Sequence, residues 1–229
     1  MRKPYLKLLR TVGKFSVWAV DGKYIRERWN GDFTNFGEHY RFRFIPMYEF
    51  WIDHEQAPGE ADFFIHHLLV EWRLMREGAE YDNALAYGDR SERAERFKSK
   101  RAKKVRKLRS NAAFIRKIHR KLLAKYRNGI RVWLVRGELV RDLYFVDYTE
   151  GGHDKVYRFV PPKEVWIDDD LSLAERRFVL LHEVHERRLM AEGWPYFKAH
   201  RSANELEYRC RHKPALLTQK LREELKLNS

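Results

Sequence analysis

The stretch "SVWAVDGKYIRERWNGDFTNFG" (residues 16–37) recurs in the chain as "RVWLVRGELVRDLYFVDYTEGG" (residues 131–152), at an offset of 115 residues. The same offset brings "RFIPMYEFWID" over "RFVPPKEVWID" and "EWRLMREG" over "ERRLMAEG" without a gap. Roughly a third of the paired positions are identical, which is typical of an internal duplication. The sequence therefore predicts two halves that share one fold.

Each half predicts the element order β-β-β-α-α, which is an α+β fold. The stretches "VWAVDG" and "VWLVRG" alternate in polarity and end at a glycine, which indicates a strand and a turn. We expect a second strand through "KYIRERW" or "ELVRDLY", and a third through "EFWID" or "EVWID". In the second half, Ser172 and Glu175 have the spacing of a capping box. The helix that follows should end at Gly193, and a second helix should run from about Tyr196 to Arg211.

These patterns divide the chain into three segments. Residues 1–98 form the first repeat, which we expect to open with a basic N-terminal helix. Residues 99–128 are rich in Lys and Arg and contain neither Pro nor Gly before residue 128, so we expect a basic helical linker. Residues 129–229 form the second repeat and end in a C-terminal helix.

The chain carries a net charge of +14, which attracts polyanions such as DNA, RNA, ribosomes or anionic lipid surfaces. We expect a nucleic acid or a ribonucleoprotein as the partner, bound by the basic linker. A solvated linker without a partner would explain the same residues, although so many like charges repel one another. The candidate nucleic-acid contacts are Lys100, Arg101, Lys103, Lys104, Arg106, Lys107, Arg109, Arg116, Lys117, Arg120 and Lys121.

The sequence predicts a cytoplasmic protein with no membrane partner. No apolar run reaches the ~18 residues of a transmembrane helix, and the first residues lack the apolar core of a signal peptide. The lone Cys210 cannot form an internal disulfide, which is typical of a reducing compartment. The sequence makes no prediction about the oligomeric state.

A group of potential metal ligands gathers around "LLHEVHERRLM" (residues 180–190). His182 and Glu186 are four residues apart, so they share one face of a helix and can bind one ion together. His200 could add a third ligand, which would leave a fourth position open for water, as in catalytic zinc sites. Glu183 stands where a general base for that water would lie. His153 follows a Gly-Gly turn and is an additional candidate ligand.

Other residues are expected to support this site. Glu207 and Asn204 share a helix face with His200, and Asp168 ends the third strand beside a turn, so all three are candidates for contacts behind the ligands. His185 is expected to face solvent or to pack. The alternative for His182 and Glu186 is a hydrogen-bonded pair without an ion.

The first repeat is expected to carry a degenerate version of this site. His67 and Glu71 match His182 and Glu186, and Glu92 matches Glu207. The other positions differ, since Leu68, Leu85 and Glu38 replace Glu183, His200 and His153. The retained pair could brace two helices instead of holding an ion.

The segment "EVWIDDDLSLAERRFVLLHEVHE" resembles minimal zincin-type metallopeptidase domains, including those of phages and mobile elements. In that family an edge strand, an acidic turn and a helix with His-Glu-x-x-His follow in order. The resemblance implies His182 as first ligand, Glu183 as base, and a third ligand on the next helix, where His200 or Glu207 could serve. It departs at Glu186, where the family has histidine. The chain is also similar to a group of phage and archaeal proteins with the patterns GGH, VWID, HExxERRLM and AHxxAN.

The sequence thus predicts a metal-dependent, zincin-like hydrolase. Zinc is the first expectation, although Glu186 as a ligand shifts the preference toward manganese or iron. A phosphoester or nucleotide substrate would suit the basic charge better than a peptide. The alternative is a non-catalytic DNA-, RNA- or ribonucleoprotein-binding protein built from two similar modules.

Overall fold

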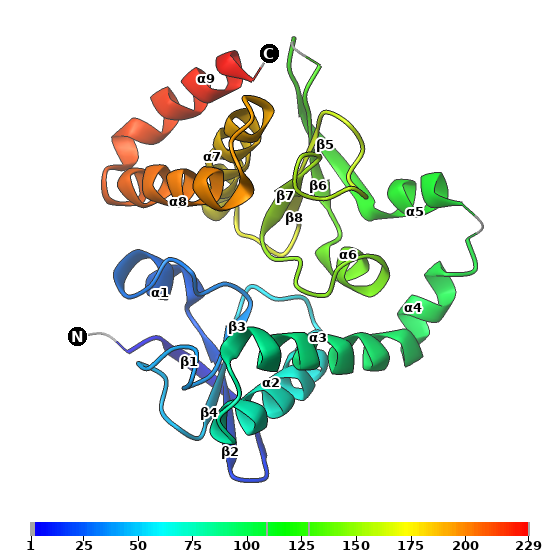
Figure 1. Ribbon diagram of the computed structural model, residues 1–229, viewed down its shortest axis with the longest axis vertical. Helices are drawn as coiled ribbons and strands as arrows, with labels where there is room; N and C mark the ends of the chain where they lie inside the picture. Colours follow the sequence, from blue (N-terminus) through cyan, green and yellow to red (C-terminus); the bar gives the residue numbers. More distant parts are fainter. Residues whose placement is uncertain (1–2, 109, 128, 229) are drawn as a thin grey trace. The chain divides into compact units, whose positions relative to one another are not determined.

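The structure, a computed structural model, describes residues 3–108, 110–127 and 129–228. It is an α+β chain with two four-stranded sheets and divides into two units (Figure 1). The first unit comprises Met1–Ser110 and Glu138–Asp147, and the second comprises Asn111–Gly137 and Tyr148–Ser229. No helix in the described part of the chain is long and apolar enough to cross a membrane.

The first unit begins with two strands of one hairpin and ends with helices. Its elements are β1 (Tyr5–Val12), β2 (Phe15–Val20), α1 (Gly22–Arg28), β3 (Phe36–Gly37), β4 (Glu49–Asp53), α2 (Ala61–Arg76), α3 (Tyr81–Lys98) and α4 (Lys100–Val105). The strand order is β1-β2-β4-β3, in which only β2 and β4 run parallel. Helix α2 packs on the sheet through Phe64, Leu68 and Trp72, which join Val17 and Phe50 in one buried cluster.

The second unit repeats this plan and extends it at its C-terminal end. Its elements are α5 (Asn111–Ile118), β5 (His119–Lys125), β6 (Arg131–Val135), β7 (Gly151–His153), β8 (Glu164–Asp168), α7 (Leu173–Ala191), α8 (Tyr196–His212), the 3-10 turn η1 (Pro214–Leu216) and α9 (Leu217–Leu227). The strand order β5-β6-β8-β7 matches that of the first unit. Helix α7 packs on the sheet through Val179 and Val184, against Val132, Val165 and Ile167.

The strand registers of the two sheets match residue by residue. Ser16 pairs with Glu49 in the first sheet, and Arg131 pairs with Glu164 in the second, at the offset read from the sequence. The hairpins β1–β2 and β5–β6 each contain two register shifts at matching places. The repeated unit is therefore β-β-α-β-β-α-α, with α6 (Gly137–Leu143) at the place of α1 in the second copy.

The predicted second strands are wrong, because these segments form the helices α1 and α6. The Asp21 side chain caps α1 by accepting the backbone N–H of Tyr24 at 2.9 Å. In α6, Leu139 and Val140 are buried. Segments of seven residues are too short for apolar spacing to separate a helix from a strand, so the cap decides.

The predicted N-terminal helix is also wrong, since Tyr5–Val12 is a strand that pairs with β2. The linker is helical only in part: α3 ends at Lys98, α4 and α5 follow, and His119–Lys125 is strand β5. Both β1 and β5 are edge strands with mostly exposed side chains. Basic residues are common on such edges because they discourage pairing with other chains.

Residues 138–147 belong to the first unit, although the sequence assigned them to the second repeat. Arg141 donates a hydrogen bond from Nε to Glu60 at 2.8 Å, and Arg96 donates one to Asp142 at 3.1 Å. Arg101 also contacts both Glu60 and Asp142. These buried charges are compensated within the first unit, which explains why the segment lies there.

The two long helices of the second unit begin and end as predicted. The Ser172 hydroxyl accepts the backbone N–H of Glu175 at 3.4 Å, so Ser172 caps α7. Gly193 follows the C-cap with a positive φ of 93°, a conformation that favours glycine. Helix α8 then begins at Tyr196 and ends at His212. The pair α7 and α8 carries most of the candidate metal ligands.

Candidate metal centre

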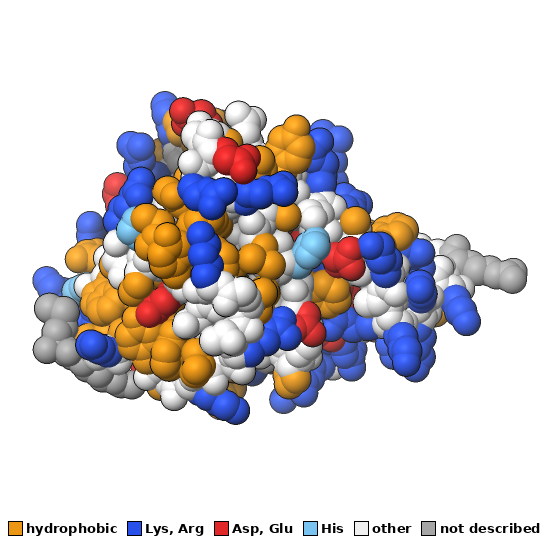
Figure 2. Space-filling view, turned by 90° about the horizontal axis from the view of Figure 1, so that it is seen from below, with side chains coloured by type: hydrophobic (Ala, Val, Ile, Leu, Met, Phe, Trp, Pro, Cys, Tyr) orange, Lys and Arg blue, Asp and Glu red, His pale blue; other side chains and the backbone are white. Residues whose placement is uncertain are grey.

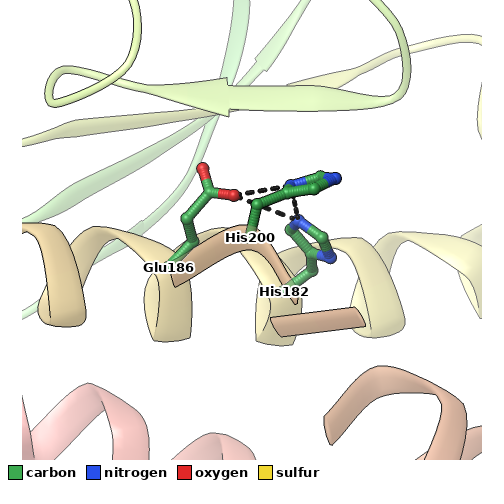
Figure 3. Close-up of side chains that lie close together, drawn as sticks. All are labelled: His182, Glu186 and His200. Carbon is green, nitrogen blue, oxygen red and sulfur yellow. Dashed lines mark hydrogen bonds and ion pairs between the residues drawn. The ribbon is translucent and has the colours of Figure 1, made fainter. Parts of the chain in front are cut away.

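Helix α7 presents His182 and Glu186 on the same side, one turn apart, and His200 reaches them from α8 (Figure 3). His182 Nε2 lies 3.2 Å from His200 Nδ1 and 3.6 Å from Glu186 Oε2. The His200 Nδ1 atom lies 2.7 Å from Glu186 Oε2. The ligand atoms of a tetrahedral zinc ion are ~3.3 Å apart, because each bond is about 2.0–2.1 Å long. The observed separations fit one small ion with modest adjustment.

A chain of hydrogen bonds holds His182 from behind. Its Nδ1 lies 3.0 Å from Glu207 Oε2, and Glu207 accepts a hydrogen bond from Arg211 Nε at 2.8 Å. Arg211 in turn contacts Glu175 at 2.9 Å. Burial raises the pKa of Glu207, but His182 and Arg211 outweigh it and hold this pKa at about 2. A carboxylate on Nδ1 directs the Nε2 lone pair toward an ion, as in carboxylate–histidine–metal arrangements.

His153 lies behind Glu186 in the observed arrangement. Its Nδ1 accepts the backbone N–H of Lys155 at 3.1 Å, so the proton is on Nε2, which donates to Glu186 Oε1 at 3.1 Å. A protonated Nε2 cannot bind a metal. His153, Glu183 and Glu186 also have ligand atoms within 4.8 Å of one another. We favour the group of His182, Glu186 and His200, because its nitrogen atoms already face one another.

Glu183 is a buried carboxyl group beside this centre. Only 8% of the residue is exposed to solvent. Strand β7 lies close to it, since a Cβ atom at Gly151 would lie 3.0 Å from Glu183 Oε1. Burial raises its pKa to about 8, with the charges of Glu186 and Glu207 adding to the effect.

The histidines and the carboxylates of the centre shift the pKa values of one another. Burial alone would lower the pKa of His182, but the carboxylates of Glu186 and Glu207 beside the ring raise it well above its usual value. Burial alone would raise the pKa of Glu186, but His153, His182 and His200 hold it well below its usual range. Protons and a metal ion would therefore compete for the same nitrogen atoms.

The remaining predicted residues lie at other places. Asp168, at the end of β8, accepts the backbone N–H of Asp170 and lies against Gly137. Asn204 is half-buried on α8. His185 is buried and bridges the helices through Glu224 at 2.8 Å and Ser202 at 2.9 Å. This Ser–His–Glu order lacks oxyanion donors, because Ser202 lies inside α8, where backbone N–H groups are used by the helix.

The first unit contains the same hydrogen-bond chain. His67 lies 3.1 Å from Glu92 and 3.3 Å from Glu71, Arg96 contacts Glu92 at 2.7 Å, and Arg96 contacts Glu60 at 2.8 Å. These are the counterparts of the contacts among Glu175, His182, Glu186, Glu207 and Arg211. Arg96 and Arg211, with the distal Glu60 and Glu175, were not among the predicted site residues. Their identity at the repeat offset was the signal that could have identified them.

The first unit differs at the positions that would complete a metal centre. Leu85 replaces His200, and Leu68 replaces Glu183. Gly88 packs against the His67 ring, where an added Cβ would lie 2.7 Å from Nε2. Glu38 replaces His153, and burial raises its pKa to about 7, with a further rise from the charge of Glu71.

The predicted basic residues are mostly exposed. Arg101 is an exception, because it pairs with Glu60 and Asp142 and is 28% exposed. Arg120 is exposed but pairs with Asp169 at 2.6 Å. Arg109 lies outside the described residues. The others that are exposed are Lys100, Lys103, Lys104, Arg106, Lys107, Arg116, Lys117 and Lys121.

Comparisons of the chain with protein-family models, with curated proteins and with solved structures found no match.

Proposed function

We propose that the second unit is a metal-dependent hydrolase of zincin-like type. The ion would be held by His182 Nε2, Glu186 Oε2 and His200 Nδ1, with zinc as the first candidate and manganese or iron as the others. The observation that carries this proposal is the convergence of these three atoms, within 3.6 Å of one another, from two helices. Glu207 supports it by orienting His182.

When bound, the ion would act as a Lewis acid and lower the pKa of water. The other functions would be carried out by residues around the ion. Glu183 would accept a proton at its carboxylate and later pass it to the leaving group. His153 keeps Glu186 in place by donating to Oε1, which leaves Oε2 for the ion. Gly151 lets strand β7 approach Glu183 closely.

The proposed substrates are phosphoesters or nucleotides, since the chain carries a charge of +14 that attracts anions. A peptide substrate is the other outcome that the zincin resemblance suggests. Hydrolysis assays with phosphodiesters, nucleotides and an unfolded protein distinguish these substrate classes.

Element analysis of the purified full chain tests the site. We expect about one tightly bound transition ion per chain, lost in His182→Ala and retained in His67→Ala, the matched change in the first unit. Glu183→Gln should keep the ion and lose hydrolysis. A wild-type chain without an ion after incubation with zinc, manganese or iron would refute the proposal, and full turnover of Glu183→Gln would refute the role of Glu183.

The second candidate function is non-catalytic nucleic-acid binding, which the exposed Lys and Arg side chains of α4 favour. This function alone would give a chain without bound ion that binds DNA or RNA with a steep salt dependence.

A further inference from the structure

A continuous face of α3 and α4 in the first unit combines exposed cations with exposed aromatic rings. We call it the α3–α4 face, formed by Tyr87, Arg90, Arg93, Phe97, Lys98, Lys103 and Arg106. Tyr87, Arg90, Arg93 and Phe97 recur every three or four residues, so they share one side of α3. The side chains at the right of Figure 2, where α4 lies in Figure 1, are largely Lys and Arg.

The aromatic side chains of this face are unusually accessible. Tyr87 is 55% exposed and Phe97 is 48% exposed, although neither ring is needed to complete the buried clusters of the unit. Arg90 lies over the Tyr87 ring, 4.1 Å from its centroid, and Arg106 lies 3.5 Å from the centroid of Phe97. Cations beside exposed rings form surfaces that attract phosphates and planar bases together.

The shape and charge of the face suit a strand of nucleic acid. An open, shallow hollow is lined by Phe97 and Ala94 and by the cations Arg90, Arg93, Lys98 and Lys103, with no acidic side chain in its lining. Tyr87 and Phe97 are ten residues apart, so they lie about 15 Å apart along the helix axis. Two rings at that separation can stack on separate bases of one strand, while the cations between them contact its phosphates.

The framework beneath the face is rigid. Arg96, on the opposite side of α3, is fully buried and pairs with Glu60 and Glu92. Ser99 caps α4 by accepting the backbone N–H of Ala102 at 3.0 Å. Arg101 anchors α4 through Glu60. The inward cations are thus neutralised, whereas the outward ones have few acidic neighbours, of which Glu95 pairs with Lys98.

We propose that the α3–α4 face binds single-stranded nucleic acid, with the cations on phosphates and with Phe97 and Tyr87 stacking on bases. Duplexes are disfavoured as ligands because their bases are already stacked on one another. The proposal deepens the nucleic-acid function and does not rest on hydrolysis at the metal centre. It extends the predicted contacts into α3 and removes Arg101 from them.

Fluorescence anisotropy with labelled oligo-dT and oligo-U, titrated with the full chain at several salt concentrations, tests the proposal. We expect Phe97→Ala to weaken binding roughly 5- to 100-fold, the effect of one lost stacking contact. Arg90→Glu with Arg93→Glu should weaken it further and flatten the salt dependence by about 0.7 per lost phosphate contact. Lys213→Glu with Lys226→Glu is the matched control, because both side chains are exposed in the second unit. Circular dichroism confirms that each variant is folded.

Three results would overturn the proposal. The first is equal binding by wild type and both α3 variants. The second is a duplex of equal length that binds as tightly as the single strand while Phe97→Ala has no effect, which would indicate a purely ionic surface. The third is binding to phosphatidylserine vesicles but not to oligonucleotides, which would indicate a membrane surface. A wild-type chain that holds no ion but binds oligonucleotides would refute the hydrolase proposal alone, whereas a chain that holds the ion but does not bind oligonucleotides would refute this one alone.

Discussion

The two units share one hydrogen-bond chain but surround it with different residues. In the first unit it runs from Glu60 through Arg96 and Glu92 to His67. In the second unit His200 joins the end of the corresponding chain. In both units these hydrogen bonds orient a histidine between two helices, whereas only the second unit places another histidine beside it.

The pKa of the shared histidine is raised in both units, but its neighbours differ. His67 contacts Glu71 and Glu92, and it lies 3.7 Å from Asp89. A protonated His67 neutralises these carboxylates, which favours a structural ion pair in the first unit. In the second unit, His182 shares Glu186 with His200 and His153, so several nitrogen atoms converge on one carboxylate.

The largest predicted effect is on the shared framework. Glu60→Gln should destabilise the chain by about 3–5 kcal/mol, because it leaves buried guanidinium groups of Arg96 and Arg141 without their full counter-charge. Denaturant unfolding followed by fluorescence measures this loss. Glu95→Gln, at an exposed ion pair with Lys98, is the control and should leave the midpoint unchanged. A similar midpoint for both variants would show that the buried network contributes little.

The next effect concerns the residue that distinguishes the two centres. His200→Leu installs the residue of the first unit and should lower metal affinity more than about 100-fold, beyond the loss caused by removing an outer partner. Competition with a chromogenic chelator measures the affinity. Unchanged affinity would remove His200 from the ligand set and favour the group of His153, Glu183 and Glu186.

The reciprocal change sharpens the comparison. Leu85→His should create a second, weaker metal site beside His67, without added hydrolysis because Leu68 stands where the second unit has Glu183. Metal stoichiometry and turnover of wild type and variant, measured in parallel, check both parts. An unchanged stoichiometry would mean that Gly88 and the surrounding packing hold His67 away from an ion.

A smaller effect is expected from the carboxylate behind His182. Glu207→Gln should lower metal affinity about 10- to 100-fold, because the amide orients the imidazole less well than the charged group. The matched change Glu92→Gln should leave metal affinity unaffected. Chelator competition distinguishes the two variants, and a loss in Glu92→Gln without one in Glu207→Gln would show that the ion lies in the first unit instead.

A pH dependence of stability is expected in the first unit. Burial lowers the pKa of His67, but Glu71 and Glu92 outweigh it and raise this pKa to about 10. A raised histidine pKa stabilises the fold fully below about 6.5, the ordinary value, and the contribution is lost as the pH rises through about 10. NMR titration of His67 in the wild type measures its pKa. Denaturant unfolding of the wild type and of His67→Gln between pH 6 and 10 measures the pH range over which His67 stabilises the fold. A midpoint near neutral pH would contradict the charged pair.

Much of the fold was predictable, because its signals are local. The glycine after α7 and the cap at Ser172 mark the helix ends by their own backbone requirements. The segment "KYIRERW" was not predictable in this way, since its few apolar residues fit a strand as well as a helix. The edge strands β1 and β5 were missed for a related reason: their partners across the hairpin, not their own residues, make them strands.

The residues of the candidate site were likewise predictable only where local spacing identifies them. His182, Glu186 and Glu183 were found from spacing on one helix, which depends only on helical geometry. Arg211 was missed because its place beside Glu207 and Glu175 depends on how α8 packs on α7. Its identity with Arg96 in the other repeat carried the information, but an arginine among so many basic residues does not stand out.

The sequence by itself determined the duplication, the bounds of α7 and α8, and the pairing of a histidine with a glutamate four residues later, because periodicity and backbone preference act over short distances. Only the tertiary structure decided which nitrogen atoms meet. The Lys155 backbone N–H assigns the proton of His153, and the packing of α8 turns His200 Nδ1 toward Glu186. It also assigned residues 138–147 to the first unit, where buried carboxylates and guanidinium groups must find each other across long stretches of chain.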